Sequence, residues 1–191
     1  DYTHFFGPST KGMAKRVALA CCRVGGRVSL LPSWAPNLHP LLVHFPVALI
    51  VTAAAADVAA VFFPRSGRLH FAASSAYTVG AIAAVVTYWT GLDAAATVRI
   101  PGMAHGLVDD HRMWALVTTW YLVAMVAARL LSELAGVGRV LRYQVLFVVL
   151  GIAGMVLVQQ TAERGARLVY EHGVGVIRTE AGARSYLARP R

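Results

Sequence analysis

The chain has 191 residues, of which 57% are hydrophobic and only 14% are charged, whereas an ordinary soluble domain has about 25% charged residues. This deficit of charge argues against a soluble globular domain and fits a chain that is solvated largely by lipid. The net charge of +9 does not indicate binding to nucleic acid, because the lysines and arginines collect outside the apolar runs, where membrane spans carry basic residues that face lipid headgroups.

The first 36 residues form a basic arm. Residues 11–31 hold five basic residues and no acidic one, which is typical of a juxtamembrane arm or of the remnant of an organellar transit segment. The only two cysteines are the adjacent Cys21 and Cys22. No CxxC or CxxCH motif occurs, which excludes covalently attached c-type haem and cysteine-bound zinc or iron–sulfur sites. We interpret the pair as small apolar residues of the arm, with palmitoylation as the alternative.

Four apolar runs follow, each of about the 20 residues that a helix needs to cross the hydrocarbon core of a bilayer. None alternates with a period of two, so all four are predicted to be helices rather than strands. The links between them are short or moderate, which predicts an all-α, up-down-up-down bundle of four membrane-spanning helices over residues 37–176, followed by a tail over 177–191. The predicted spans are residues 41–63, 71–92, 113–131 and 145–162.

Small residues indicate where these helices approach one another closely. Gly80 and Ala84 lie on the second span, Gly151 and Gly154 on the fourth, and the run 53–56 on the first consists of alanine. No convincing internal repeat is evident, and secondary transporters usually contain repeats and broken helices. Metal handling or transport therefore ranks last among the candidate functions.

Five histidines are expected at one end of the bundle, because an even number of spans separates the segments that carry them. His39 and His44 open the first span, His105 and His111 precede the third, and His172 follows the fourth. Imidazole suits iron, copper and zinc. His44 and His111 are predicted to lie at one depth and to ligate haem iron, with His39, His105 and His172 as further cofactor-binding candidates. The carboxylates that could orient these rings are Asp93, Asp109, Asp110 and Glu171.

The alternative for these histidines is ordinary. Histidine is common where a helix meets the membrane surface, and the His-Pro and Phe-Pro steps near residues 39–46 can simply shape the start of the first helix.

Two charges lie toward the other end of the spans. Asp57 belongs to the first and Arg129 to the third, and an unpaired charge in a membrane is costly, so we predict an ion pair between these helices. The alternatives are a solvated Asp57, or one paired with Arg65 or Arg68, or a role in proton relay. His70, near the start of the second span, is interpreted as an interfacial residue.

Several motifs resemble those of an uncharacterised membrane family, domain of unknown function 2231. They are HPLLVHFPVAL at residues 39–49, TGLD at 90–93, His111 together with Arg129, and GARLVYEHGVGV at 165–176. The resemblance covers residues 37–176 and implies a four-helix membrane protein. Members of that family are mostly bacterial and are often associated with cytochromes or other redox components, but no function is settled for the family.

Together these observations predict an integral membrane subunit of a larger respiratory or photosynthetic redox complex that holds b-type haem for electron transfer. The runner-up is a cofactor-free structural or assembly subunit of such a complex. The expected partners are other subunits and lipids, without nucleic acid or a soluble small-molecule substrate. The expected location is a bacterial or mitochondrial inner membrane. No hydrolase, kinase or dehydrogenase motif occurs, so we expect an electron-transfer or structural subunit rather than an enzyme by itself.

Overall fold

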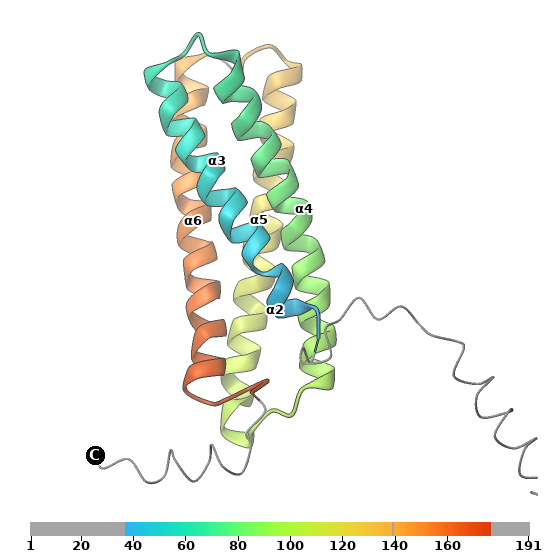
Figure 1. The fold of residues 1–191 in the computed structure, drawn as a ribbon. Helices are drawn as coiled ribbons and strands as arrows, with labels where there is room; N and C mark the ends of the chain where they lie inside the picture. Colours follow the sequence, from blue (N-terminus) through green and yellow to red (C-terminus); the bar gives the residue numbers. More distant parts are fainter. Residues whose placement is uncertain (1–36, 139, 177–191) are drawn as a thin grey trace, which may run out of the picture. The chain divides into compact units, whose positions relative to one another are not determined.

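The computed structural model describes residues 37–138 and 140–176. The basic arm with Cys21 and Cys22 and the tail 177–191 lie outside the described residues. Four helices in the described part are long and apolar enough to cross a membrane, which confirms the predicted all-α bundle (Figure 1). In chain order the elements are α2 (His39–Leu42), α3 (His44–Phe62), α4 (Gly67–Thr97), the 3-10 helix η1 (Gly102–Ala104), α5 (His105–Leu134) and α6 (Leu141–Tyr170).

The helices are arranged as a ring in which each packs against antiparallel neighbours. α3 packs against α4 and α6, and α5 packs against the same two helices. The links α3–α4 and α5–α6 lie at one end of the bundle, and the link α4–α5 lies at the other (Figure 1). α3 and α5 are therefore parallel and diagonal to each other, as α4 and α6 are. The predicted histidine end of the bundle is the end that carries the link α4–α5.

The helices extend beyond the predicted apolar runs. α4 has 31 residues, and a helix of that size is roughly 46 Å long, about the thickness of a bilayer with its headgroup layers. Hydropathy marks only the part of a helix that lies in hydrocarbon, whereas the hydrogen bonds of the helix continue into the interfacial layers. The ends of the helices therefore place polar side chains at headgroup depth.

A break at Val43 separates α2 from α3. Pro46 has no N–H to donate to the carbonyl of Leu42, so the helical hydrogen-bond ladder is interrupted there. The Thr87 hydroxyl of α4 donates to the Leu42 oxygen at 3.4 Å. The short α2, which carries His39, packs against α4.

The centre of the bundle is tightly packed. Tyr77, Ile50 and Leu122 are the largest fully buried side chains in the described part. Glycines at the predicted contact faces allow this packing: a Cβ on Gly80 would lie 3.0 Å from Ile50 Cδ1, and one on Gly154 would lie 3.5 Å from Leu122 Cδ2. Large apolar side chains cover the outside, as expected for helices that face lipid; they include Phe62, Phe71, Trp89, Trp120 and Leu131.

Gly151 supports a prediction about stability. A Cβ at this position would collide with the Tyr77 hydroxyl, which is buried in the core. We expect Gly151→Ala to destabilise the protein by about 1–3 kcal/mol, the usual effect of overpacking a core. Thermal unfolding in detergent would measure this. Gly106→Ala is the matched control, because no atom lies within 4 Å of the added methyl group; a loss of stability at Gly106 equal to that at Gly151 would contradict the packing argument.

The two helical hairpins of the bundle are related by an internal repeat. Residues of α2 and α3 correspond to residues of α5 at a constant separation of 72 positions, as from 39 to 111 and from 57 to 129. Residues of α4 correspond to residues of α6 at a separation of 74 positions, as from 80 to 154. The contacts repeat as well: Gly80 faces Leu49 and Ile50, and Gly154 faces their counterparts Tyr121 and Leu122.

Counterparts also contact each other along the centre of the bundle. Asp57 pairs with Arg129, the Tyr77 hydroxyl faces Gly151, and the Nε2 atom of His70 lies 3.3 Å from Nε2 of Gln144. Residues that touch their own counterparts lie on a twofold axis. A pseudo-twofold axis therefore runs along the bundle through these three pairs.

This repeat corrects the expectation that the chain has none. Most counterparts are different apolar residues, because lipid-facing positions require only an apolar side chain, and the similarity is therefore faint in the sequence. Identity is confined to a few positions that include His39 and His111, Gly80 and Gly154, Thr87 and Thr161, and Gly91 and Gly165.

Candidate cofactor site

His39 is held against the end of α4 by two features of that helix. Its Nδ1 atom lies 3.0 Å from the carbonyl oxygen of Thr87. Its ring rests on Gly91, where a Cβ would lie only 3.0 Å from His39 Cε1. Gly91 is one turn beyond Thr87 on α4, so the missing side chain exposes the carbonyl to the ring. The result is a half-buried imidazole with a defined orientation.

His111 is held against α6 in the same way. Its Nδ1 atom lies 3.0 Å from the carbonyl oxygen of Thr161, and a Cβ on Gly165 would lie 3.1 Å from His111 Cε1. The Thr161 hydroxyl is 2.9 Å from the hydroxyl of Thr118 on α5, which ties the two helices together at this level. Each half of the repeat therefore contains one histidine in a cradle formed by a threonine carbonyl and a glycine.

These hydrogen bonds fix the tautomer of both rings when they are neutral. A carbonyl oxygen can only accept, so Nδ1 of His39 and of His111 carries the hydrogen, and Nε2 of the neutral ring keeps its lone pair. A histidine that donates its other N–H to a carbonyl is the usual arrangement for a metal ligand, because the bond orients the ring and raises the basicity of the coordinating nitrogen.

The two rings are counterparts in the internal repeat and lie on opposite sides of the pseudo-twofold axis. The described residues contain no group of three or more His, Cys, Asp and Glu side chains that could hold a metal ion alone. Two axial imidazoles are the complete protein contribution to a b-type haem, because the porphyrin supplies the other nitrogens. Two imidazoles, each with Nδ1 bound to a carbonyl, are therefore the kind of donor set that such a group takes.

The other predicted histidines lie elsewhere. His44 is exposed, and the counterpart of His111 in the repeat is His39 rather than His44. Five residues of helix turn the chain by about 500°, so His39 and His44 cannot face the same way, and the break at Val43 separates them further. His105 is exposed, with Nδ1 3.0 Å from the Gly102 oxygen of its own turn, and His172 is half-buried in the turn after α6.

Carboxylates do not orient the two cradled rings. Asp93, Asp109, Asp110 and Glu171 are all exposed, and Glu171 accepts a hydrogen bond from Nε of Arg167 at 3.0 Å. The carbonyls of Thr87 and Thr161 and the glycines beside them take this part, and the sequence reasoning missed them. The one available signal was the pattern GxxxxxxTxxxG, which occurs at residues 80–91 and again at 154–165.

The predicted ion pair between the first and third spans is confirmed. Nη2 of Arg129 donates to Oδ1 of Asp57 at 2.7 Å and Nη1 donates to Oδ2 at 2.8 Å, and both residues are about 95% buried. Nε of Arg129 donates to the Ser74 hydroxyl at 2.8 Å, and the guanidinium lies 5.1 Å from the centre of the Phe147 ring. Asp57 is therefore neither solvated nor paired with Arg65 or Arg68.

The glycines of the two cradles carry a further prediction. Gly165→Ala should push the His111 ring off its carbonyl partner, and Gly91→Ala should do the same to His39. If these rings ligate haem iron, as we propose below, either change should weaken haem binding by about 10- to 100-fold, the usual effect of losing a group that orients a metal ligand. Haem content per protein and the position of the reduced absorption band measure it. Unchanged values in both variants, with Gly106→Ala as reference, would show that the cradles do not position a cofactor.

Comparisons with known proteins identify the family of the chain. No curated protein and no solved structure matches it significantly. Residues 35–178 match the family described as "Predicted membrane protein (DUF2231)", and this segment contains both cradled histidines and both cradle glycines. The match covers most of the chain and includes all four spans. The chain therefore belongs to this family of membrane proteins.

Proposed function

We propose that the protein is an integral membrane subunit of a redox complex and that it holds b-type haem between its first and third spans. His39 and His111 are the proposed axial ligands. The observation that carries the proposal is the repeated cradle: two imidazoles from diagonal helices, each with Nδ1–H bound to a helix carbonyl and with Nε2 available. This changes the first ligand expected from the sequence from His44 to His39.

Bound haem would supply one-electron exchange, and the residues of the chain would tune and protect it. The Thr87 and Thr161 carbonyls would orient the two rings, keep the hydrogen on Nδ1 so that Nε2 can ligate iron, and increase the basicity of Nε2. The glycines provide the space for the rings. The surrounding helices bury both rings partly and limit the access of water.

Electrons would pass to or from neighbouring subunits, in a respiratory or photosynthetic membrane of bacterial or organellar type. The large apolar side chains that cover the outer faces of the helices provide contacts for lipid and for other membrane subunits. A cofactor-free assembly subunit would use the same outer faces, but it would have no use for the repeated cradles.

Transport receives less support than haem binding. The repeat and the break at Val43 are features found in transporters. However, the pseudo-twofold axis of the described bundle is filled by the fully buried Tyr77, Ile50 and Leu122 and by the pair Asp57–Arg129. This leaves no path along the axis.

An absorption spectrum of the purified full chain tests the proposal. We expect a reduced-minus-oxidised band of low-spin, bis-imidazole haem, in a ratio of about one haem to one chain. Expression with added haem precursor excludes a shortage of cofactor as the reason for a missing band. A fully folded protein without the band under these conditions would rule out haem binding and leave the assembly role.

A further inference from the structure

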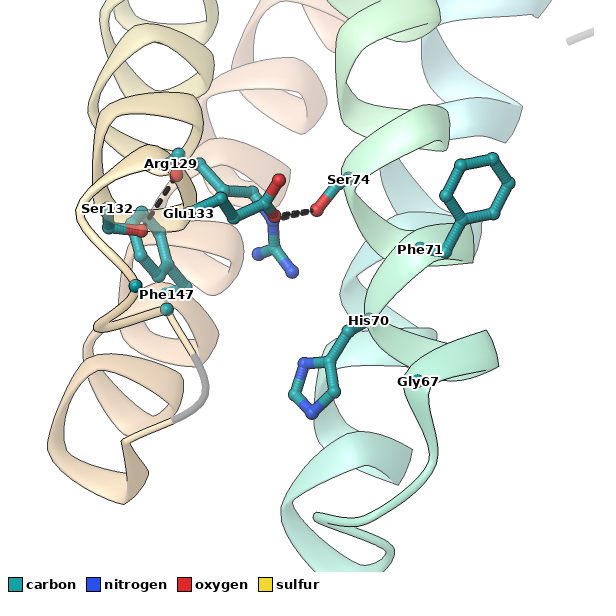
Figure 2. A pocket seen from close by; sticks show the side chains of 10 residues that line it. Gly67, His70, Phe71, Ser74, Arg129, Ser132, Glu133 and Phe147 are labelled. Carbon is teal, nitrogen blue, oxygen red and sulfur yellow. Dashed lines mark hydrogen bonds and ion pairs between the residues drawn. The ribbon is translucent and has the colours of Figure 1, made fainter.

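A pocket of about 410 Å³ opens between α4 and α5 at the end of the bundle opposite the cradled histidines. His70 and Ser74 of α4 line one side, and Arg129, Ser132 and Glu133 of α5 line the other. Figure 2 shows the His70 ring and the Arg129 guanidinium in the space between these helices, whereas the Phe71 ring points away from it. The pocket is thus a polar recess between two spans.

The internal repeat provides a comparison for this pocket. On the other side of the pseudo-twofold axis the counterparts of Ser74, Ser132 and Glu133 are Val148, Ala60 and Val61. The two hairpins pack in the same way on both sides of the pseudo-twofold axis. Packing alone therefore does not require polar residues on one side only. Ser74, Ser132 and Glu133 are therefore an addition to the shared scaffold, whereas His70 and Arg129 have polar counterparts in Gln144 and Asp57.

The charges of the pocket favour a cation. Arg129 lines the pocket, but its Nη1 and Nη2 already donate to Asp57 and its Nε to Ser74, so the charge of the guanidinium is balanced by the Asp57 carboxylate. Glu133 is a second carboxylate beside the same guanidinium, with Oε1 3.6 Å from Nε of Arg129 and accepting from the Ser74 hydroxyl. Two carboxylates face one guanidinium, and one negative charge is left over.

The chemistry of the pocket selects an organic cation over a metal ion. The described residues offer no group of three or more metal-ligating side chains, whereas a single carboxylate of which 41% is exposed suits a charge-assisted hydrogen bond from an ammonium group. The aromatic ring of Phe147 forms part of the wall and suits the apolar portion of such a molecule.

We propose that this pocket binds the protonated amine of a small amphipathic molecule, with Glu133 accepting its N–H groups. The pocket lies at the first turns of α4 and the last turns of α5, which is headgroup depth for helices of this length. The ammonium can therefore come from an aminophospholipid headgroup or from a free aliphatic or aromatic amine. The site is separate from the cradles, and a sample without haem would still contain it.

Calorimetric titration tests whether binding requires the positive charge of the ligand. The purified full chain in detergent is titrated with 2-phenylethylamine and, separately, with 2-phenylethanol, which has a similar shape but no charge. We expect binding of the amine and at least about tenfold weaker binding of the alcohol. Glu133→Gln keeps the shape and removes the charge, and should weaken amine binding at least about tenfold, as expected for loss of a charge-assisted hydrogen bond. Glu171→Gln, at an exposed carboxylate beyond α6, is the matched control and should change nothing.

Native mass spectrometry distinguishes a lipid headgroup from a free amine as the source of the ammonium group. The protein is taken from nanodiscs that contain both phosphatidylethanolamine and phosphatidylcholine. Retention of phosphatidylethanolamine that is lost in Glu133→Gln identifies the headgroup amine, and binding of 2-phenylethylamine without such retention identifies a free amine. Equal binding of amine and alcohol, equal binding by Glu133→Gln with a normal unfolding temperature, or binding of neither probe would each overturn the proposal.

Discussion

Replacing His39 or His111 by alanine is expected to remove the haem band from the purified protein. In the proposed site each ring supplies one of the two axial nitrogens, and no other histidine in the described chain is held in a cradle that could replace it. The loss of affinity should exceed the roughly 10- to 100-fold that loss of an orienting group costs. Haem content per chain and the reduced-minus-oxidised spectrum measure the effect.

Two other histidines provide matched controls for this experiment. His44 and His105 lie near the same end of the bundle but are exposed, and alanine at either position should leave the spectrum unchanged. Added imidazole should restore a low-spin band in His111→Ala, because it can enter the space left by the ring and ligate the iron. A band that disappears in His44→Ala and persists in His39→Ala would return the site to the pair first predicted from the sequence.

Replacing Arg129 by leucine is expected to destabilise the protein by about 3–5 kcal/mol, because it leaves the Asp57 carboxylate buried without its partner. Thermal unfolding in detergent should show a large fall in the midpoint. Arg167→Ala removes an exposed pair with Glu171 and should leave the unfolding midpoint nearly unchanged.

The internal repeat allows a stringent second test of this pair. Asp57 and Arg129 are counterparts across the pseudo-twofold axis, so the exchanged variant Asp57→Arg with Arg129→Asp places the same two groups at equivalent positions. We expect the exchange to recover part of the lost stability. Recovery should be incomplete, because Ser74 supports the guanidinium only in the native arrangement and its counterpart is Val148. An exchanged variant no more stable than Arg129→Leu would show that the pair is not the source of the stability.

The predicted spans and the buried ion pair were accessible to sequence reasoning for different physical reasons. A helix that crosses hydrocarbon must be apolar over its whole embedded length, and this requirement is visible in a single run of residues. Asp57 and Arg129 could be matched because charges inside a membrane need a partner and few were available. The length of the helices was underestimated, since the interfacial turns of α4, α5 and α6 carry no apolar signature.

The identity of the paired histidines depended on tertiary structure. The sequence places His39 and His44 at one end of the first span, but the direction of each ring depends on the break that Pro46 causes and on the exposed carbonyl beside Gly91. Neither contact is local, since 48 residues separate His39 from Thr87 and 50 separate His111 from Thr161. The repeated glycine and threonine in α4 and α6 can be recognised as histidine contacts only when the helices are packed.

The sequence by itself thus determined four membrane-spanning helices and one buried ion pair, because both follow from the cost of placing polar groups in lipid, and the even number of spans then gathered the histidines at one end. Tertiary structure decided which imidazoles are held by a carbonyl, which glycines cradle them and where a polar pocket opens between α4 and α5. These features depend on the approach of helices that are distant in the chain, and hydropathy carries no information about the direction in which a side chain points across a bundle.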